Sequence, residues 1–200
     1  MKTAIINTGY LRTAEKCRAN QWANLLEGVD FDEYYFTHEK ITFLHPDRMG
    51  NVFQKQIPYN FYPTLPTPHP YYANKAPETE PCNVLNMWHN LFISFCLVPN
   101  TYDCYVRNRP DIQFSGRVHL ENEPGKVYIP HGNDYREGIN DQFAFGCYES
   151  MRVYFSLYLY HERYFNQGVM FHPEGYLNHH LKENGIEIVR VDPTQWILRP

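Results

Sequence analysis

Hydrophobic and polar positions follow two periods along this chain, one typical of strands and one of helices. A β-branched, apolar run at residues 3–7 ends in a Thr-Gly turn and predicts a strand. Apolar residues then recur at helical spacing from Leu11 to Leu26, and Gly28 stands where such a helix would end. Residues 31–37 predict a second strand. Strand, helix and strand in this order are typical of the start of an α/β sheet.

The remainder of the chain continues the alternation and predicts a mixed α/β domain. A helix is expected from Pro81, where proline suits the first turn, and another over residues 173–184, stopped by Gly185. Between and after them the pattern predicts strands at 102–107, 126–129, 139–146 (after a turn) and 186–191, and a long aromatic helix at 149–164. We therefore expect one domain over residues 1–200.

One segment departs from both periods. Eight of the 15 prolines lie between Pro46 and Pro81, interleaved with tyrosines and phenylalanines. This proline density excludes a regular helix and a central strand. We interpret residues 46–81 as a long loop anchored by aromatic side chains, and loops of this length in compact domains are usually functional or disordered. The tyrosine content favours a functional loop.

Composition limits the classes of partner and compartment. With 18 Lys plus Arg against 22 Asp plus Glu, the formal net charge is −4, which argues against a general nucleic-acid binder. The five cysteines form no C-x-x-C pair, which favours reduced thiols and a cytoplasmic protein over a disulfide framework. The longest apolar run, at residues 91–98, is too short to cross a bilayer, so no transmembrane segment is expected.

The segment Tyr102–Asp111 carries the strongest chemical signal. An apolar strand there delivers Arg107, Arg109 and Asp111 to its carboxyl end, which is where ligands bind in open α/β sheets. A carboxylate in this position can hold Mg²⁺ or Mn²⁺, and the arginines can bind phosphate in bidentate fashion. The alternative is an ordinary ion pair between Arg107 and Asp111 at a strand end.

Residues 8–22 are similar to the motif S-G-Q-x-R-T…C…W, with Thr8 and Tyr10 in place of Ser and Gln. Residues 102–111, 140–146 and 173–181 are similar to the motifs Y-D-x-x-x-R-x-R-x-D, N-D-Q-F-A-F-G and P-E-x-x-L-x-x-H-L. With these four segments, in this order, the chain resembles a group of bacterial and viral nucleotide-sugar glycosyltransferases with the GT-A fold. A strict D-x-D motif is absent. The resemblance implies a single GT-A-like, Rossmann-related domain with a mixed, mostly parallel sheet flanked by helices.

The resemblance also assigns roles to residues. Asp111 and His172 are expected to hold Mn²⁺ or Mg²⁺ beside the donor diphosphate. The donor, a UDP- or GDP-type nucleotide sugar, is expected to contact the first turn and the two arginines: Thr8, Gly9, Tyr10, Arg12, Arg107 and Arg109. The turn offers backbone groups and an aromatic face for the base, and Arg12, at the opening of the first helix, can reach phosphate with the amides of that helix.

Two carboxylates are the candidates for acid–base chemistry. Asp141 follows Gly138 in a short loop before an aromatic strand and is our choice for the base or the acceptor contact. Its alternative role is an Asx turn, which the Asn140-Asp141 pair also suits. Glu174 ranks second, because a carboxylate in the first turn of a helix is favoured by the helix dipole alone. His180 is expected to face inward on that helix.

We therefore expect a metal-assisted glycosyltransferase that moves a sugar from a nucleotide-sugar donor to a hydroxyl of a glycan acceptor, in polysaccharide biosynthesis. Two alternatives remain at this point. One is a non-catalytic nucleotide- or glycan-binding module of the same fold. The other is a metal-dependent phosphoesterase that uses Asp111, His172 and Glu174.

Overall fold

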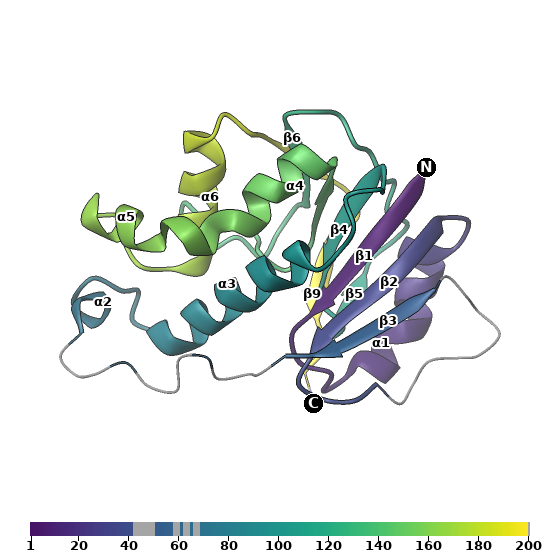
Figure 1. The fold of residues 1–200 in the computed structure, drawn as a ribbon, viewed down its shortest axis with the longest axis horizontal. Coiled ribbons are helices and arrows are strands. Elements are labelled where there is room, and N and C mark those ends of the chain that lie inside the picture. Colours follow the sequence, from purple (N-terminus) through teal and green to yellow (C-terminus); the bar gives the residue numbers. More distant parts are fainter. Residues whose placement is uncertain (42–50, 58–60, 62–64, 66–68, 200) are drawn as a thin grey trace.

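A seven-stranded sheet forms the centre of the computed structural model, which describes residues 1–41, 51–57, 61, 65 and 69–199. From one edge to the other, the strands are β3 (Val52–Gln56), β2 (Asp30–Thr37), β1 (Lys2–Thr8), β4 (Cys104–Asn108), β7 (Ala144–Gly146), β6 (Lys126–Pro130) and β8 (Glu187–Val191). Strand β7 is antiparallel to both of its neighbours, and every other neighbouring pair is parallel. The predicted fold class, α/β with a mixed, mostly parallel sheet flanked by helices, is confirmed (Figure 1).

Alternating side chains place a hydrophobic core on each face of this sheet. On one face, helices α3 (Pro81–Cys96), α4 (Tyr148–Phe155) and α6 (Pro173–Glu183) pack on strand residues such as Ile6 and Tyr105. On the other face, α1 (Ala14–Gln21) and the π-helical turn Trp22–Leu26 cover residues such as Ile5 and Val106. A small antiparallel sheet of β5 (Ile112–Phe114) and β9 (Gln195–Ile197) completes this second layer.

The structure differs from the sequence prediction in three places. Strand β3 lies inside the segment interpreted as a loop. It contains no proline and, among the described residues, pairs only with β2, so it is an edge strand that the proline rule allows. The same segment holds a short helix, α2 (Pro70–Ala73), and residues 42–50, 58–60, 62–64 and 66–68 lie outside the described residues. The long aromatic helix is divided by the 3-10 turn Ser156–Tyr160 into α4 and α5 (His161–Asn166). Strands β5 and β9 were not predicted.

The connections create a switch point between β1 and β4. The chain leaves β1 through α1 on one face and returns in β2, whereas it enters β4 through α3 on the opposite face. Helices α1 and α3 therefore lie on opposite faces of the sheet (Figure 1). In open α/β sheets, ligands bind outside the carboxyl ends of the strands at such a switch point. The fold therefore directs attention to the residues that follow these two strands.

Candidate anion-binding and catalytic site

A cavity of about 330 Å³ opens at the carboxyl ends of β1, β2 and β4. This volume lies within the range typical of small-molecule sites, about 300–1,000 Å³. Its walls are formed by the segment after β1, the ends of β2 and β4, and one face of α3. All six residues that we expected to bind the donor line it: Thr8, Gly9, Tyr10, Arg12, Arg107 and Arg109. The fold thus brings together residues about one hundred positions apart in the sequence.

The turn after β1 is shaped by Gly9, whose φ of +119° is a conformation that other residues rarely adopt. This turn presents the Tyr10 ring edge-on to His38, with 5.2 Å between ring centroids. The Arg12 guanidinium carbon lies 4.0 Å from the Tyr10 ring centroid, a cation–π contact. Arg12 is exposed and lies two residues before the start of α1, so its charge borders the cavity from the solvent side.

Arg107 is a buried cation without a carboxylate partner among the described residues. It is 2% exposed, and its Nη1 donates to the backbone oxygens of Thr8 (3.3 Å) and Asn108 (2.5 Å), whereas its Nε finds no partner. Burial lowers the pKa of Arg107 to about 10, so the group is still charged near neutral pH. The negative charges of Asp141 and Asp111 act on Arg107, but neither carboxylate forms an ion pair with it. An anion in the adjoining cavity would give this buried cation a direct partner.

Arg109 forms the ion pair that Arg107 lacks. Its Nε and Nη2 donate to the two carboxylate oxygens of Asp111, each at 2.9 Å, and the Asp111 side chain is only 2% exposed. Burial acts to lower the pKa of Arg109, but the hydrogen bonds and charge of Asp111 outweigh it, and the net shift is upward. The alternative that we kept open, an ion pair at this strand end, is therefore found, with Arg109 in place of Arg107.

Asp141 lies beside these arginines at the end of a tightly held loop. The loop is fixed by Asn140, which is fully buried: its Oδ1 accepts from the Gln142 backbone N–H (2.9 Å) and from Gln195 Nε2 (3.1 Å). Asn140 therefore makes the Asx turn that we had considered for Asp141. No side chain in the described ranges donates to the Asp141 carboxylate, which is partly exposed. The pKa of Asp141 is raised to about 6, mainly by burial and secondly by the negative charge of Glu174.

Glu174 is held in the first turn of α6 by two contacts. Its Oε2 lies 2.8 Å from His172 Nδ1, and the His172 ring stacks on Tyr135 with centroids 4.2 Å apart. Gly138 approaches the α6 backbone so closely that a Cβ at this position would lie 2.5 Å from the Glu174 carbonyl carbon. The Ile139 backbone N–H donates to the Glu174 backbone oxygen (3.2 Å). The loop that carries Asp141 is thus fastened to the helix that carries Glu174.

The predicted metal ligands do not form a metal centre in this arrangement. Both oxygens of Asp111 accept hydrogen bonds from Arg109, and His172 contacts Glu174. Across the described residues, no group of three or more His, Cys, Asp or Glu side chains is placed to hold a metal ion. Asp111 and His172 each contact a protein side chain in this structure, and their role as Mn²⁺ or Mg²⁺ ligands stays a prediction. The phosphoesterase alternative, which needs Asp111, His172 and Glu174 around a metal, gains no support from them.

Three asparagines of α3, which the sequence analysis did not single out, also line the cavity. Asn83, Asn86 and Asn90 recur at three- and four-residue spacing, which places them on one face of the helix. Their amides can donate to phosphate or ribose oxygens and accept from hydroxyls. The sequence signal that could have identified these asparagines as site residues is the polar stripe that they form on an otherwise apolar helix. Met87 lies between them and also borders the small apolar gap beside Asp141.

Comparison with known proteins adds no identification. No model of a known protein family matches the chain, and no curated protein matches it. None of the helices that the structure describes is both long enough and apolar enough to cross a membrane.

Proposed function

We propose that this chain is a glycosyltransferase that binds a nucleotide-sugar donor in the cavity at the carboxyl ends of β1, β2 and β4. The observation that carries the proposal is Arg107, a buried arginine that lacks a carboxylate partner in the described part of the chain and borders a cavity at the switch point of the sheet. A diphosphate in this cavity gives Arg107 a direct anionic partner. Arginines suit this ligand because the guanidinium binds phosphate oxygens in pairs.

The site residues have different roles in sugar transfer. Arg12, Arg107 and Arg109 stabilise the negative charge that develops on the leaving diphosphate, and Tyr10 offers a ring face to the nucleoside base. Asp141 accepts the proton of the acceptor hydroxyl while that oxygen bonds to the anomeric carbon and the bond to the diphosphate breaks. Glu174 keeps the pKa of Asp141 raised, close to working pH. The three arginines supply charge stabilisation from the protein itself.

The experiment that tests this proposal is calorimetric titration with UDP, GDP and their sugars, with and without Mn²⁺. Arg12→Gln removes an exposed cavity cation and should weaken nucleotide binding about tenfold, the equivalent of one charge-assisted hydrogen bond. Arg117→Gln is the matched control, because Arg117 is also exposed, pairs with Glu27 and lines no part of this cavity.

Three results are decisive. Binding that is weakened in Arg12→Gln and unchanged in Arg117→Gln supports the donor site. Absence of binding for every nucleotide sugar refutes it. Donor binding without turnover, in the presence of a range of glycan acceptors, favours the non-catalytic module of the same fold.

A further inference from the structure

The donor cavity is rich in hydrogen-bond donors and, among the described residues that line it, contains no carboxylate. Arg12, Arg107 and Arg109 line it, and a guanidinium group can only donate hydrogen bonds. The nearby Asp111 carboxylate does not line the cavity, and both of its oxygens already accept from Arg109. The cavity therefore suits a ligand that has many acceptors and few donors.

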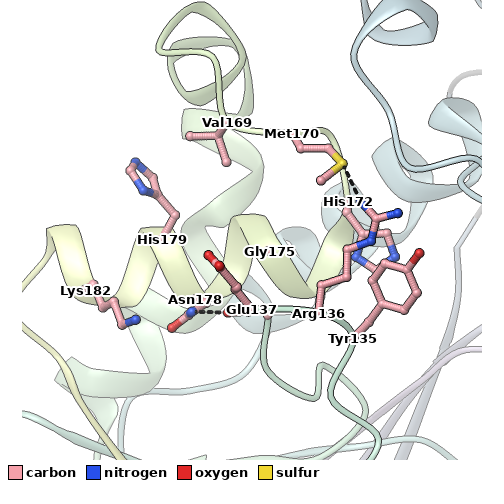
Figure 2. A pocket seen from close by; sticks show the side chains of 11 residues that line it. Tyr135, Arg136, Glu137, Val169, Met170, His172, Gly175, Asn178, His179 and Lys182 are labelled. Carbon is pink, nitrogen blue, oxygen red and sulfur yellow. Dashed lines mark hydrogen bonds between the residues drawn. The ribbon is translucent and has the colours of Figure 1, made fainter.

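A second cavity, of about 510 Å³ beside α6, has a lining of mixed charge by comparison. Figure 2 shows Glu137 in this cavity between two cations, Arg136 and Lys182. The Asn178 amide there donates to the Glu137 backbone oxygen (2.5 Å). A carboxylate such as Glu137 can accept from the amino groups of a ligand, and the described lining of the donor cavity offers no such group.

The asparagines of α3 supply amides to the donor cavity. The stripe from Asn83 to Asn90 covers about 10 Å along the helix, at about 1.5 Å per residue. Asn86, in the middle, is 3% exposed. The exposed Asn83 amide makes no hydrogen bond with a described residue, and Asn90 Oδ1 has a long contact with His89 Nδ1 (3.4 Å). The Asn83 and Asn90 amides can therefore both donate to a ligand and accept from it.

Aromatic and apolar side chains complete the lining at the carboxyl ends of the strands. The Tyr10 and His38 rings lie edge to face, with 5.2 Å between their centroids. Phe36, near the end of β2, and Ile57, directly after β3, also line the cavity and are nearly buried. Such walls suit the flat faces of a nucleobase. The amides of α3 are then the groups that can distinguish one base edge from another.

The nucleobases differ in the partners that their edges need. Guanine, adenine and cytosine each carry an amino group, whose N–H donors require acceptors. In guanine the N1–H lies beside this amino group, and a carboxylate can accept from both. Uracil and thymine have no amino group, and their N3–H lies between two carbonyl oxygens. A single carboxamide matches N3–H and one of these oxygens, because it both accepts and donates.

We propose that the donor cavity selects a pyrimidine with an imide edge, uracil or thymine, and that Asn83 and Asn90 determine this specificity. The inference rests on the proposed function, because it assigns the base of the donor. One of the two amides pairs with N3–H and a neighbouring carbonyl oxygen, and the other, two turns away, binds a ribose hydroxyl. Guanine is disfavoured because its adjacent donors find no carboxylate among the described lining residues.

The test is calorimetric titration of the full chain with UDP, dTDP, CDP, GDP and ADP. N3-methyl-UDP is added because it keeps the diphosphate and lacks the N3–H donor. UDP and dTDP share the imide edge, so a difference between them reports on the ribose 2′-hydroxyl and the 5-methyl group. The double variant Asn83→Ala/Asn90→Ala removes the two amides. The control, Asn122→Ala/Asn166→Ala, removes two amides from positions that do not line this cavity.

We expect the tighter of UDP and dTDP to bind at least tenfold more strongly than CDP, GDP, ADP and N3-methyl-UDP, because each of these leaves a hydrogen-bonding group unpaired. The preference should be lost in Asn83→Ala/Asn90→Ala and retained in the control. Thermal unfolding of each variant verifies that it is folded.

The inference is overturned if GDP, ADP, CDP or N3-methyl-UDP binds as tightly as UDP and dTDP. It is also overturned if Asn83→Ala/Asn90→Ala keeps the preference. Inorganic pyrophosphate, titrated on the wild type, separates this failure from failure of the proposed function. Binding of pyrophosphate and of all nucleotides alike leaves the donor site in place and refutes only the specificity. Absence of binding for pyrophosphate and every nucleotide refutes both.

Discussion

Replacing Asp111 by Asn tests whether this carboxylate stabilises the fold or holds a metal. In the structure its two oxygens accept from Arg109 Nε and Nη2, both at 2.9 Å, with the Asp111 side chain 2% and the Arg109 side chain 22% exposed. The amide introduced by Asp111→Asn would keep one acceptor oxygen and present N–H groups to a guanidinium that has lost its counter-charge. Stability, rather than metal binding, should respond first.

The size of the effect follows from the burial of the pair. Removing one partner of a buried ion pair typically destabilises a protein by about 3–5 kcal/mol. Arg109 retains some contact with solvent, so we expect the lower end, about 3 kcal/mol. For a chain of 200 residues this corresponds to a fall in Tm of about 6–12 °C.

The assay is thermal and urea unfolding of the wild type and of Asp111→Asn, followed by circular dichroism. Glu27→Gln is the control, because Glu27 pairs with Arg117 at 3.6 Å and its side chain is 62% exposed, so its loss should cost less than about 1 kcal/mol. If Asp111→Asn unfolds within about 2 °C of the wild type, a threshold of roughly 1 kcal/mol, and loses a Mn²⁺-dependent step of donor binding, the structural interpretation is refuted and Asp111 is a metal ligand.

Two further predictions concern pH. His180 is fully buried, bonded to the Tyr164 hydroxyl (2.6 Å) and the Val153 oxygen (2.8 Å), and burial lowers its pKa to about 4. As pH falls, His180 is protonated in the unfolded chain before it is protonated in the folded chain, so stability is lost from about pH 6.5 toward pH 4. Urea unfolding should show about 2 kcal/mol less stability at pH 5 than at pH 7. A His180→Gln variant that keeps this loss would contradict the attribution of the pH dependence to His180. For Asp141, whose pKa is raised to about 6, release of nucleoside diphosphate should rise with pH and reach half its maximum near 6. Asp141→Asn should lower the rate at least about a hundredfold and abolish that rising limb, and a limb that persists would remove Asp141 as the base.

Local features of the sequence were sufficient to predict most elements of the fold. The apolar runs of β1, β2 and β4, the proline starts of α3 and α6 and the stop at Gly185, whose φ is +69°, lie where the pattern predicted them. The inward orientation of His180 followed from helix geometry and is confirmed by its full burial. These features depend on a residue's immediate neighbours in the chain, and hydrophobic periodicity records them directly.

The candidate site required the tertiary structure, because it depends on which distant segments meet. Arg107 is buried because β4 is a central strand and helix α4 packs on it. The partner of Asp111 is Arg109, an outcome set by the turn that follows β4. Strand β3 forms in a proline-rich segment because β2 offers it a free edge. The hydrophobic periodicity of the chain predicted an α/β sheet. The tertiary structure, in which the connections lie first on one face of that sheet and then on the other, placed at its switch point a buried arginine, Arg107, with no carboxylate partner among the described residues.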